Sequence, residues 1–231
     1  MTYLVLIASV LIGVFLVEVL NDLKASAIKL LLAFSGAYLF AISVFHLLPE
    51  VYTGDGKRIG LFLLIGFILQ IVLEFFSQGI EHGHGHLQNK TIPISMLISL
   101  AIHAYLEGMP LGGIEHHGHH HGDFEDSLLT GIALHKIPVT IVLMSLFAQA
   151  GFSKTKSFLL IGVFAIMAPL GTLSGDLVQE LSYYHREIMA VVVGIFFHIS
   201  TTILFETSEA HKFNIQKLLA IALGSILAWM V

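Results

Sequence analysis

Eight apolar stretches of about 20 residues, separated by short polar breaks, constrain the fold of this chain more than any other feature. A helix of about 20 residues crosses the hydrocarbon core of a bilayer, which is roughly 30 Å thick. Transmembrane β-strands would alternate apolar and polar residues over ~10 positions, and no stretch here sustains that pattern. The sequence therefore predicts an all-α integral membrane protein.

Composition supports this interpretation, because only 12% of the residues are charged, against roughly 25% in soluble proteins. The first stretch starts at Thr2 without a preceding basic residue, so we expect a membrane span there and not a removable signal peptide. No break is long enough for a separate domain. We expect one transmembrane domain over 1–231, an eight-helix bundle with spans near 3–20, 28–49, 59–80, 92–113, 127–149, 156–176, 187–206 and 213–230.

The positions of Lys and Arg predict the orientation, because short cytoplasmic loops retain positive charge. Placing both termini outside the cytoplasm puts seven basic residues at inner loops and three at outer loops. The inner ones are Lys24, Lys29, Lys90, Lys154, Lys156, Lys212 and Lys217, and the outer ones are Lys57, Arg58 and Arg186. The remaining basic residue, Lys136, falls inside the fifth span. The chain is compact and shows no targeting signal, so we expect the bacterial inner membrane.

Two loops are rich in histidine, which is a zinc ligand. The loop after the third span and the loop after the fourth span carry His82, His84, His86, His116, His117, His119, His120 and His121. Such loops can hold Zn²⁺ weakly, and we expect them to capture and pass on ions; a solvated linker is the alternative interpretation. The chain has no cysteine, so a thiolate metal site is excluded.

The fourth and fifth spans carry ionisable residues at membrane depth. His103 and Glu107 are four residues apart and share a helix face, and His135 lies in the next span. Pro110 and Pro138 follow them, and we expect each proline to kink its helix and free a backbone carbonyl, that of Leu106 in the first case.

Ionisable groups at this depth are costly and mark ion paths or binding sites. Two imidazoles and one carboxylate suit Zn²⁺, with Fe²⁺, Mn²⁺, Cd²⁺ or Co²⁺ as alternatives. A lone histidine in a span, such as His198, can instead be a hydrogen-bonded packing residue.

These motifs resemble those of the ZIP (Zrt- and Irt-like protein) family of divalent-metal transporters, and the resemblance extends over essentially the whole chain. The matching segments are His103-x-x-x-Glu107-Gly108 with Pro110, His135-x-x-Pro138, His46-Leu47-Leu48-Pro49-Glu50, Pro169-Leu170-Gly171 with Gly175, and 206–211. The resemblance implies an inverted repeat of spans 1–3 and 6–8 around spans 4–5, which carry the metal site. It also implies an exit region at Glu209 and His211.

The chain departs from the family pattern where many relatives bind a second ion. The positions that would carry those ligands are occupied by Ala104, Lys136, Val139 and Ala168. The first site keeps three ligands, and His46 or His198 could supply a fourth. The Lys136 ammonium could replace the second ion and pair with Glu107, or the bound metal could keep this amine neutral.

The resemblance implies transport of divalent cations, Zn²⁺ foremost, toward the cytoplasm, and not enzyme activity. The alternatives are an intramembrane metal-dependent hydrolase, for which the chain lacks His-Glu-x-x-His, and a metal sensor or binding protein that has lost transport. We expect divalent ions and the lipid bilayer as partners, no nucleic acid, and a homodimer as one oligomeric state to test.

Overall fold

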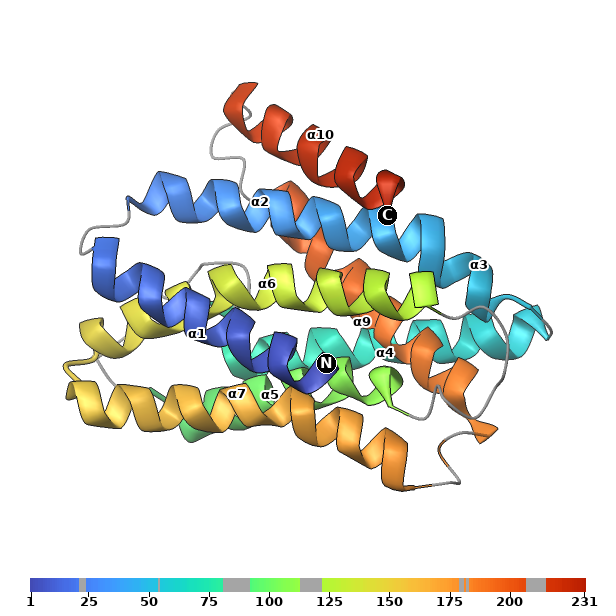
Figure 1. Ribbon diagram of the computed structural model, residues 1–231, viewed down its shortest axis with the longest axis horizontal. Coiled ribbons are helices and arrows are strands. Elements are labelled where there is room, and N and C mark those ends of the chain that lie inside the picture. Colours follow the sequence, from blue (N-terminus) through green and yellow to red (C-terminus); the bar gives the residue numbers. More distant parts are fainter. Residues whose placement is uncertain are drawn as a thin grey trace.

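The computed structural model describes residues 1–20, 24–53, 55–80, 92–112, 122–178, 181, 183–206 and 215–231, and gives only the backbone at 122–125 and 206. The described residues contain no β-strand. The long helices are α1 (Thr2–Leu20), α2 (Ala25–Ile42), α4 (Gly56–Ser77), α5 (Ile94–Gly108), α6 (Gly122–Gln149), α7 (Lys154–Leu177), α9 (His185–Glu206) and α10 (Ile215–Met230). The predicted all-α membrane bundle is confirmed (Figure 1).

The lengths of these helices agree with membrane crossing. Seven helical segments in the described part of the chain are long and apolar enough to span a bilayer, and α10, with 16 residues, is the shorter eighth helix. The largest differences from the predicted boundaries are at α5, which ends at Gly108 and not near 113, and at α6, which begins at Gly122 and not near 127. Acidic residues follow Gly122 in the sequence, and acidic residues are favourable in the first turn of a helix.

Three of the prolines have different effects on their helices. A π-helical turn (Ser43–Leu47) and the short helix α3 (Leu48–Val51), which contains Pro49, extend α2 to the predicted end of the second span. Pro138 lies inside α6, which stays helical through it. At Pro110, α5 has already ended and a 3₁₀ turn (Met109–Leu111) follows. The Leu106 carbonyl accepts the Met109 N–H, so the prediction that Pro110 frees this carbonyl was wrong.

The helix pairings have the pattern that an inverted repeat produces. The most extensive contacts are those of α4 with α9, α2 with α10, α1 with α6, and α5 with α7. In the predicted repeat, α1 corresponds to α7, α2 to α9, α4 to α10 and α5 to α6. Under this correspondence the α4–α9 contact is equivalent to the α10–α2 contact, and the α1–α6 contact is equivalent to the α7–α5 contact. Figure 1 shows α6 in the middle of the bundle, and α6 is the most buried of the seven candidate spans.

Glycines let the α5–α7 pair approach closely. A Cβ at Gly108 would collide with the backbone carbonyl of Ala168, and one at Gly171 would collide with the carbonyl of Tyr105. Small residues at such contacts favour helix association in membranes, because they allow backbone to touch backbone. This contact fixes the end of α5 next to Glu107.

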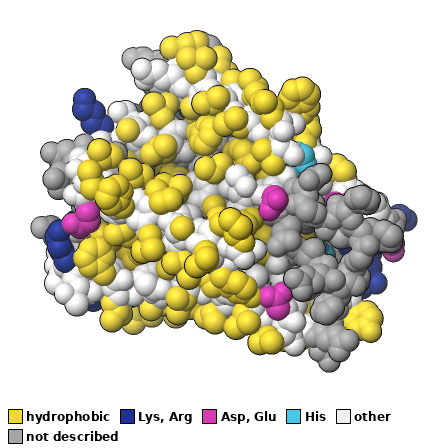
Figure 2. Space-filling view, in the orientation of Figure 1, with side chains coloured by type: hydrophobic (Ala, Val, Ile, Leu, Met, Phe, Trp, Pro, Cys, Tyr) yellow, Lys and Arg dark blue, Asp and Glu magenta, His cyan; other side chains and the backbone are white. Residues whose placement is uncertain are grey.

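The surface is apolar where lipid would surround it. In Figure 2, hydrophobic side chains cover the middle of the visible face, and Lys and Arg side chains lie only at its left and right ends. Large exposed apolar residues occur on α1, α4, α7 and α10, including Phe15, Phe75, Leu159 and Trp229. Water-exposed patches of this extent are rare in soluble proteins. The chain is an integral membrane protein.

Candidate metal centre

Three potential metal ligands meet between α5 and α6. His103 and Glu107 come from α5, one helical turn apart, and His135 comes from α6. All three side chains are buried, with at most 2% of their surface exposed. One ligand atom from each residue lies within 4.8 Å of the other two. Sequence spacing placed only the first two on a common face, and the fold brings His135 of α6 to them.

Glu107 is the centre of this group. Its Oε1 lies 3.0 Å from His103 Nε2, and its Oε2 lies 3.2 Å from Lys136 Nζ. Lys136 is only 2% exposed, so this ion pair lies away from solvent. With neutral imidazoles, the carboxylate and the ammonium balance each other. A buried pair of this kind is retained only when both partners are held in place.

The donor set fits a divalent ion of intermediate softness. Two imidazole nitrogens and one carboxylate oxygen form a His₂Glu set, which Zn²⁺ uses together with a water molecule in a fourth position. The same set tolerates Fe²⁺, Mn²⁺ and Co²⁺ with different preferences. An ion bound here would have three protein ligands and an open position.

Helix α7 contacts both the end of α5 and the side chain of Lys136. Thr172 Oγ1 donates to the carbonyl oxygens of Gly108, at 3.0 Å, and Ala168, at 3.2 Å. On the same helix, the ring of Phe164 lies under the amine of Lys136, with Nζ 4.8 Å from the ring centroid. This distance allows a cation–π contact, which is stronger away from water. α7 therefore positions both the end of α5 and the ammonium.

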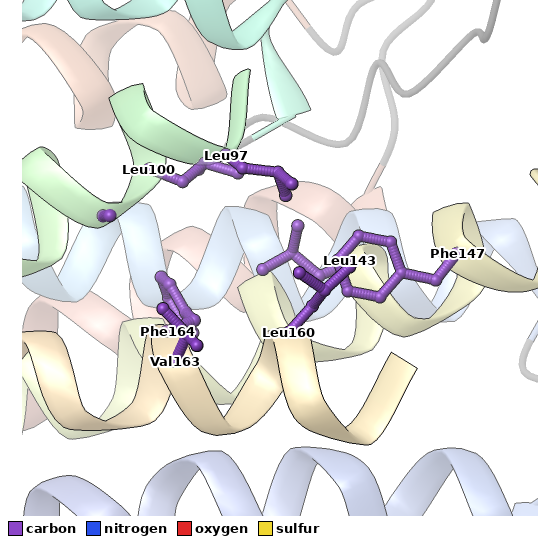
Figure 3. Close-up of a pocket in the computed structure, with 8 residues that line it drawn as sticks. Leu97, Leu100, Leu143, Phe147, Leu160, Val163 and Phe164 are labelled. Atoms are coloured by element: carbon purple, nitrogen blue, oxygen red, sulfur yellow. The ribbon is translucent and has the colours of Figure 1, made fainter. Parts of the chain in front are cut away.

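An apolar pocket lies on one side of the cluster, between α5, α6 and α7 (Figure 3). Its lining residues precede His103 in α5 and follow His135 in α6, so the pocket lies toward the membrane side where α7 begins. Only hydrocarbon side chains are drawn around it in Figure 3, and the lining comprises Leu97, Leu100, Ala101, Leu143, Phe147, Leu160, Val163 and Phe164.

Comparison with protein families gives a match over residues 81–231 to a family model described as ZIP zinc transporter. The match covers nearly two thirds of the chain and includes His103, Glu107 and His135. The chain belongs to the ZIP zinc transporter family. Members of this family are transporters of divalent metal ions and not enzymes. A search of curated proteins gives no match.

In this ZIP protein, the four positions singled out as replacements of a second ion site are all buried. Ala104, Val139 and Ala168 place only apolar side chains in the core. Lys136 is the exception, and its amine contacts Glu107. The pairing of Lys136 with Glu107 was one of the two alternatives considered from the sequence, and the structure shows this contact.

The two other histidines considered as a fourth ligand have different partners. His46 lies in the π-helical turn, and its Nε2 is 2.9 Å from the carbonyl oxygen of Ala228 on α10. The Nε2 of His198 on α9 contacts a carboxylate oxygen of Glu74 on α4, and the His198 ring lies edge-on to Phe67. Neither belongs to the three-residue group that the described residues form. We therefore describe the centre with three protein ligands.

Sequence reasoning missed Gln70, which lies on α4. Its Oε1 is 3.2 Å from His103 Nδ1, and the side chain is fully buried. Glu74, the partner of His198, lies one turn further along the same helix. Two polar residues spaced four apart in an otherwise apolar span were the available signal.

Several predicted residues lie outside the described part of the chain. These are the histidines of the two loops and the exit residues, namely His82, His84, His86, His116, His117, His119, His120, His121, Glu209 and His211. Their capture and exit roles stay predictions.

Proposed function

We propose that this ZIP protein carries Zn²⁺ toward the cytoplasm, one ion at a time, through the centre formed by His103, Glu107 and His135. The observation that supports this proposal is the meeting of two buried imidazoles and a buried carboxylate within 4.8 Å, in the part of the chain that matches the family. Polar groups of this kind are expensive in a membrane interior and persist where they bind or conduct ions.

The single-ion proposal depends on Lys136. Its ammonium lies 3.2 Å from Glu107 Oε2, so it occupies one face of the only carboxylate in the three-residue group. A second divalent ion on that face would meet a positive charge at short range, and the repulsion in a low-dielectric site is large. The remaining face, between Glu107 Oε1 and the two histidines, accepts one ion.

Release toward the cytoplasm requires the helices to move. Under the predicted orientation, the apolar pocket between α5, α6 and α7 lies on the cytoplasmic side of the centre. An ion leaving along that route would meet hydrocarbon side chains that offer it no ligand, which is unfavourable for a dehydrated cation. We therefore propose that these helices separate during transport, so that access to the centre alternates between the two membrane sides.

The direction of transport rests on the orientation, which can be tested separately. The chain lacks cysteine, so single cysteines can be introduced without background labelling. We expect Val231→Cys to react with a membrane-impermeant maleimide from outside intact cells, and Lys156→Cys to react only after permeabilisation. The reverse pattern would invert the proposed topology. The bacterial inner membrane and a homodimer stay predictions.

A metal sensor or binding protein without transport is the second candidate, and the Lys136–Glu107 ion pair favours it. A fixed ammonium could hold the carboxylate in one position and so prevent passage of the ion. Flux of Zn²⁺, Mn²⁺, Fe²⁺, Co²⁺ and Cd²⁺ into sealed proteoliposomes, with and without a pH gradient, separates the two candidates. Transport predicts saturable Zn²⁺ uptake that is lost in His103→Ala, whereas binding without uptake would support the sensor.

A further inference from the structure

Gln70 is a fully buried amide on α4, a helix that contributes no ligand to the three-residue group. An amide in an apolar interior destabilises the fold unless it is hydrogen-bonded. The Oε1 atom of Gln70 lies 3.2 Å from His103 Nδ1. The burial and this contact indicate that Gln70 holds the His103 ring in its orientation.

This contact influences which nitrogen of His103 carries a proton when an ion is bound. An amide oxygen can only accept, so the hydrogen bond to Gln70 requires a proton on Nδ1. The other nitrogen, Nε2, faces Glu107 Oε1 at 3.0 Å. Metal-binding histidines commonly donate one N–H to an acceptor, which fixes the ring and leaves the second nitrogen for the metal. Two acceptors at that distance repel each other unless a cation lies between them, so Gln70 favours the tautomer in which Nε2 and Glu107 Oε1 both offer lone pairs to a bound ion.

The backbone of α4 is well placed to hold Gln70 still. A Cβ at Gly66, one turn before Gln70, would collide with the backbone of Val191 on α9, and one at Gly194 of α9 would collide with the backbone of Leu63 on α4. These reciprocal contacts lock α4 against α9. Gln70 thus projects from a fixed helix pair toward a ligand on α5.

We propose that Gln70 is a positioning residue for the transported ion, acting through the orientation and tautomer of His103. This inference rests on the proposed function of the centre. It predicts that an acceptor at position 70, and not merely a side chain that fills the space, is needed for tight binding. Loss of such supporting hydrogen bonds typically lowers metal affinity by about 10–100-fold.

The test compares Zn²⁺ affinity, measured by calorimetry on purified protein, for the unmodified protein, Gln70→Leu and Gln70→Glu. Leu removes the acceptor, and Glu keeps an oxygen at about the same reach. Ser99→Ala is the matched control, because Ser99 Oγ donates to the Leu73 carbonyl at 2.5 Å and so also joins α5 to α4 without touching a ligand. We expect roughly 10–100-fold weaker binding for Leu, and affinities close to the unmodified protein for Glu and for Ser99→Ala.

Nitrogen-15 NMR of the His103 ring reports which ring nitrogen carries the proton. A Gln70 that only stabilised the fold would not affect this tautomer. With Zn²⁺ bound, we expect the Nδ1–H form in the unmodified protein and in Gln70→Glu, and a weaker preference for it in Gln70→Leu. If Gln70→Leu does not fold, Gln70→Asn takes its place, since its amide is one methylene short of His103 and should also bind Zn²⁺ more weakly.

Three results would overturn the proposal: unchanged affinity in Gln70→Leu or its Asn replacement, equally weak binding in Gln70→Glu, or equally weak binding in Ser99→Ala. His103→Ala serves as the reference for the centre itself. If His103→Ala loses Zn²⁺ binding and Gln70→Leu does not, Gln70 has no positioning role, but the assignment of the metal centre is retained. If His103→Ala binds normally, the proposed function fails with it.

Discussion

Lys136 Nζ lies 3.2 Å from Glu107 Oε2, and neither side chain is more than 2% exposed. The two charges come from different helices, α6 and α5, and meet beside His103 and His135. In the proposed single-ion centre, this carboxylate is shared between a fixed ammonium and one ion. This contact has consequences for stability and binding that can be measured separately.

Replacing Lys136 by Met should change stability and metal affinity in opposite directions. The variant keeps an unbranched side chain one atom shorter and leaves Glu107 as an uncompensated buried charge, which typically destabilises a protein by roughly 3–5 kcal/mol. Zn²⁺ no longer competes with an ammonium for the carboxylate, so we expect tighter binding. Thermal unfolding without metal and Zn²⁺ calorimetry measure the two effects. A variant of unchanged stability and affinity would show that the ion pair has no role.

Removal of His103 or Glu107 should abolish saturable Zn²⁺ uptake, and Glu107→Ala should also lower stability because it leaves the Lys136 ammonium unpaired. Each alanine variant removes one of three protein ligands, and the residual pair cannot hold a dehydrated ion. His46→Ala is the matched control, because His46 contacts the Ala228 carbonyl and not the centre. Uptake into proteoliposomes should persist in the control. Near-normal uptake in either ligand variant would contradict the assignment.

The histidines at 116–121 should affect apparent affinity and not maximal rate. They belong to a loop outside the membrane barrier in the predicted orientation, where they can only raise the local ion concentration. Changing all five to Ser should therefore raise the half-saturating Zn²⁺ concentration of uptake and leave the maximal rate unchanged. An identical concentration dependence would support the solvated-linker interpretation.

The close approach of α5 and α7 should make Gly171→Ala strongly destabilising. A Cβ there would collide with the Tyr105 carbonyl, whereas one at Gly162, on the same helix, would meet nothing within 4 Å. Overpacking of this kind costs roughly 1–3 kcal/mol or more, so Gly171→Ala should unfold earlier and Gly162→Ala should not. Thermal unfolding in detergent compares them. Equal melting temperatures would show that the helices can separate without cost.

Much of the architecture followed from the sequence because membrane helices are set by local composition. Apolar length alone predicted the helices, and the four-residue spacing predicted that His103 and Glu107 share a face. The contact of Gln70 with His103 could not be predicted, because it depends on which helix packs opposite His103. His46 and His198 looked equivalent to the other span histidines, and only packing against α10 and α4 distinguishes them. The turn in which the Met109 N–H donates to the Leu106 carbonyl could not be predicted from the sequence either.

Counting bound ions tests the central claim most directly. Anomalous diffraction at the zinc edge, from crystals of the protein with Zn²⁺, should show one ion between α5 and α6, bound by His103, Glu107 and His135. The double variant Lys136→Asp with Val139→Glu provides the comparison, because it restores carboxylates on the face that Lys136 covers and should admit a second ion. Two fully occupied ions in the unmodified protein, or no ion at these three residues, would contradict the account.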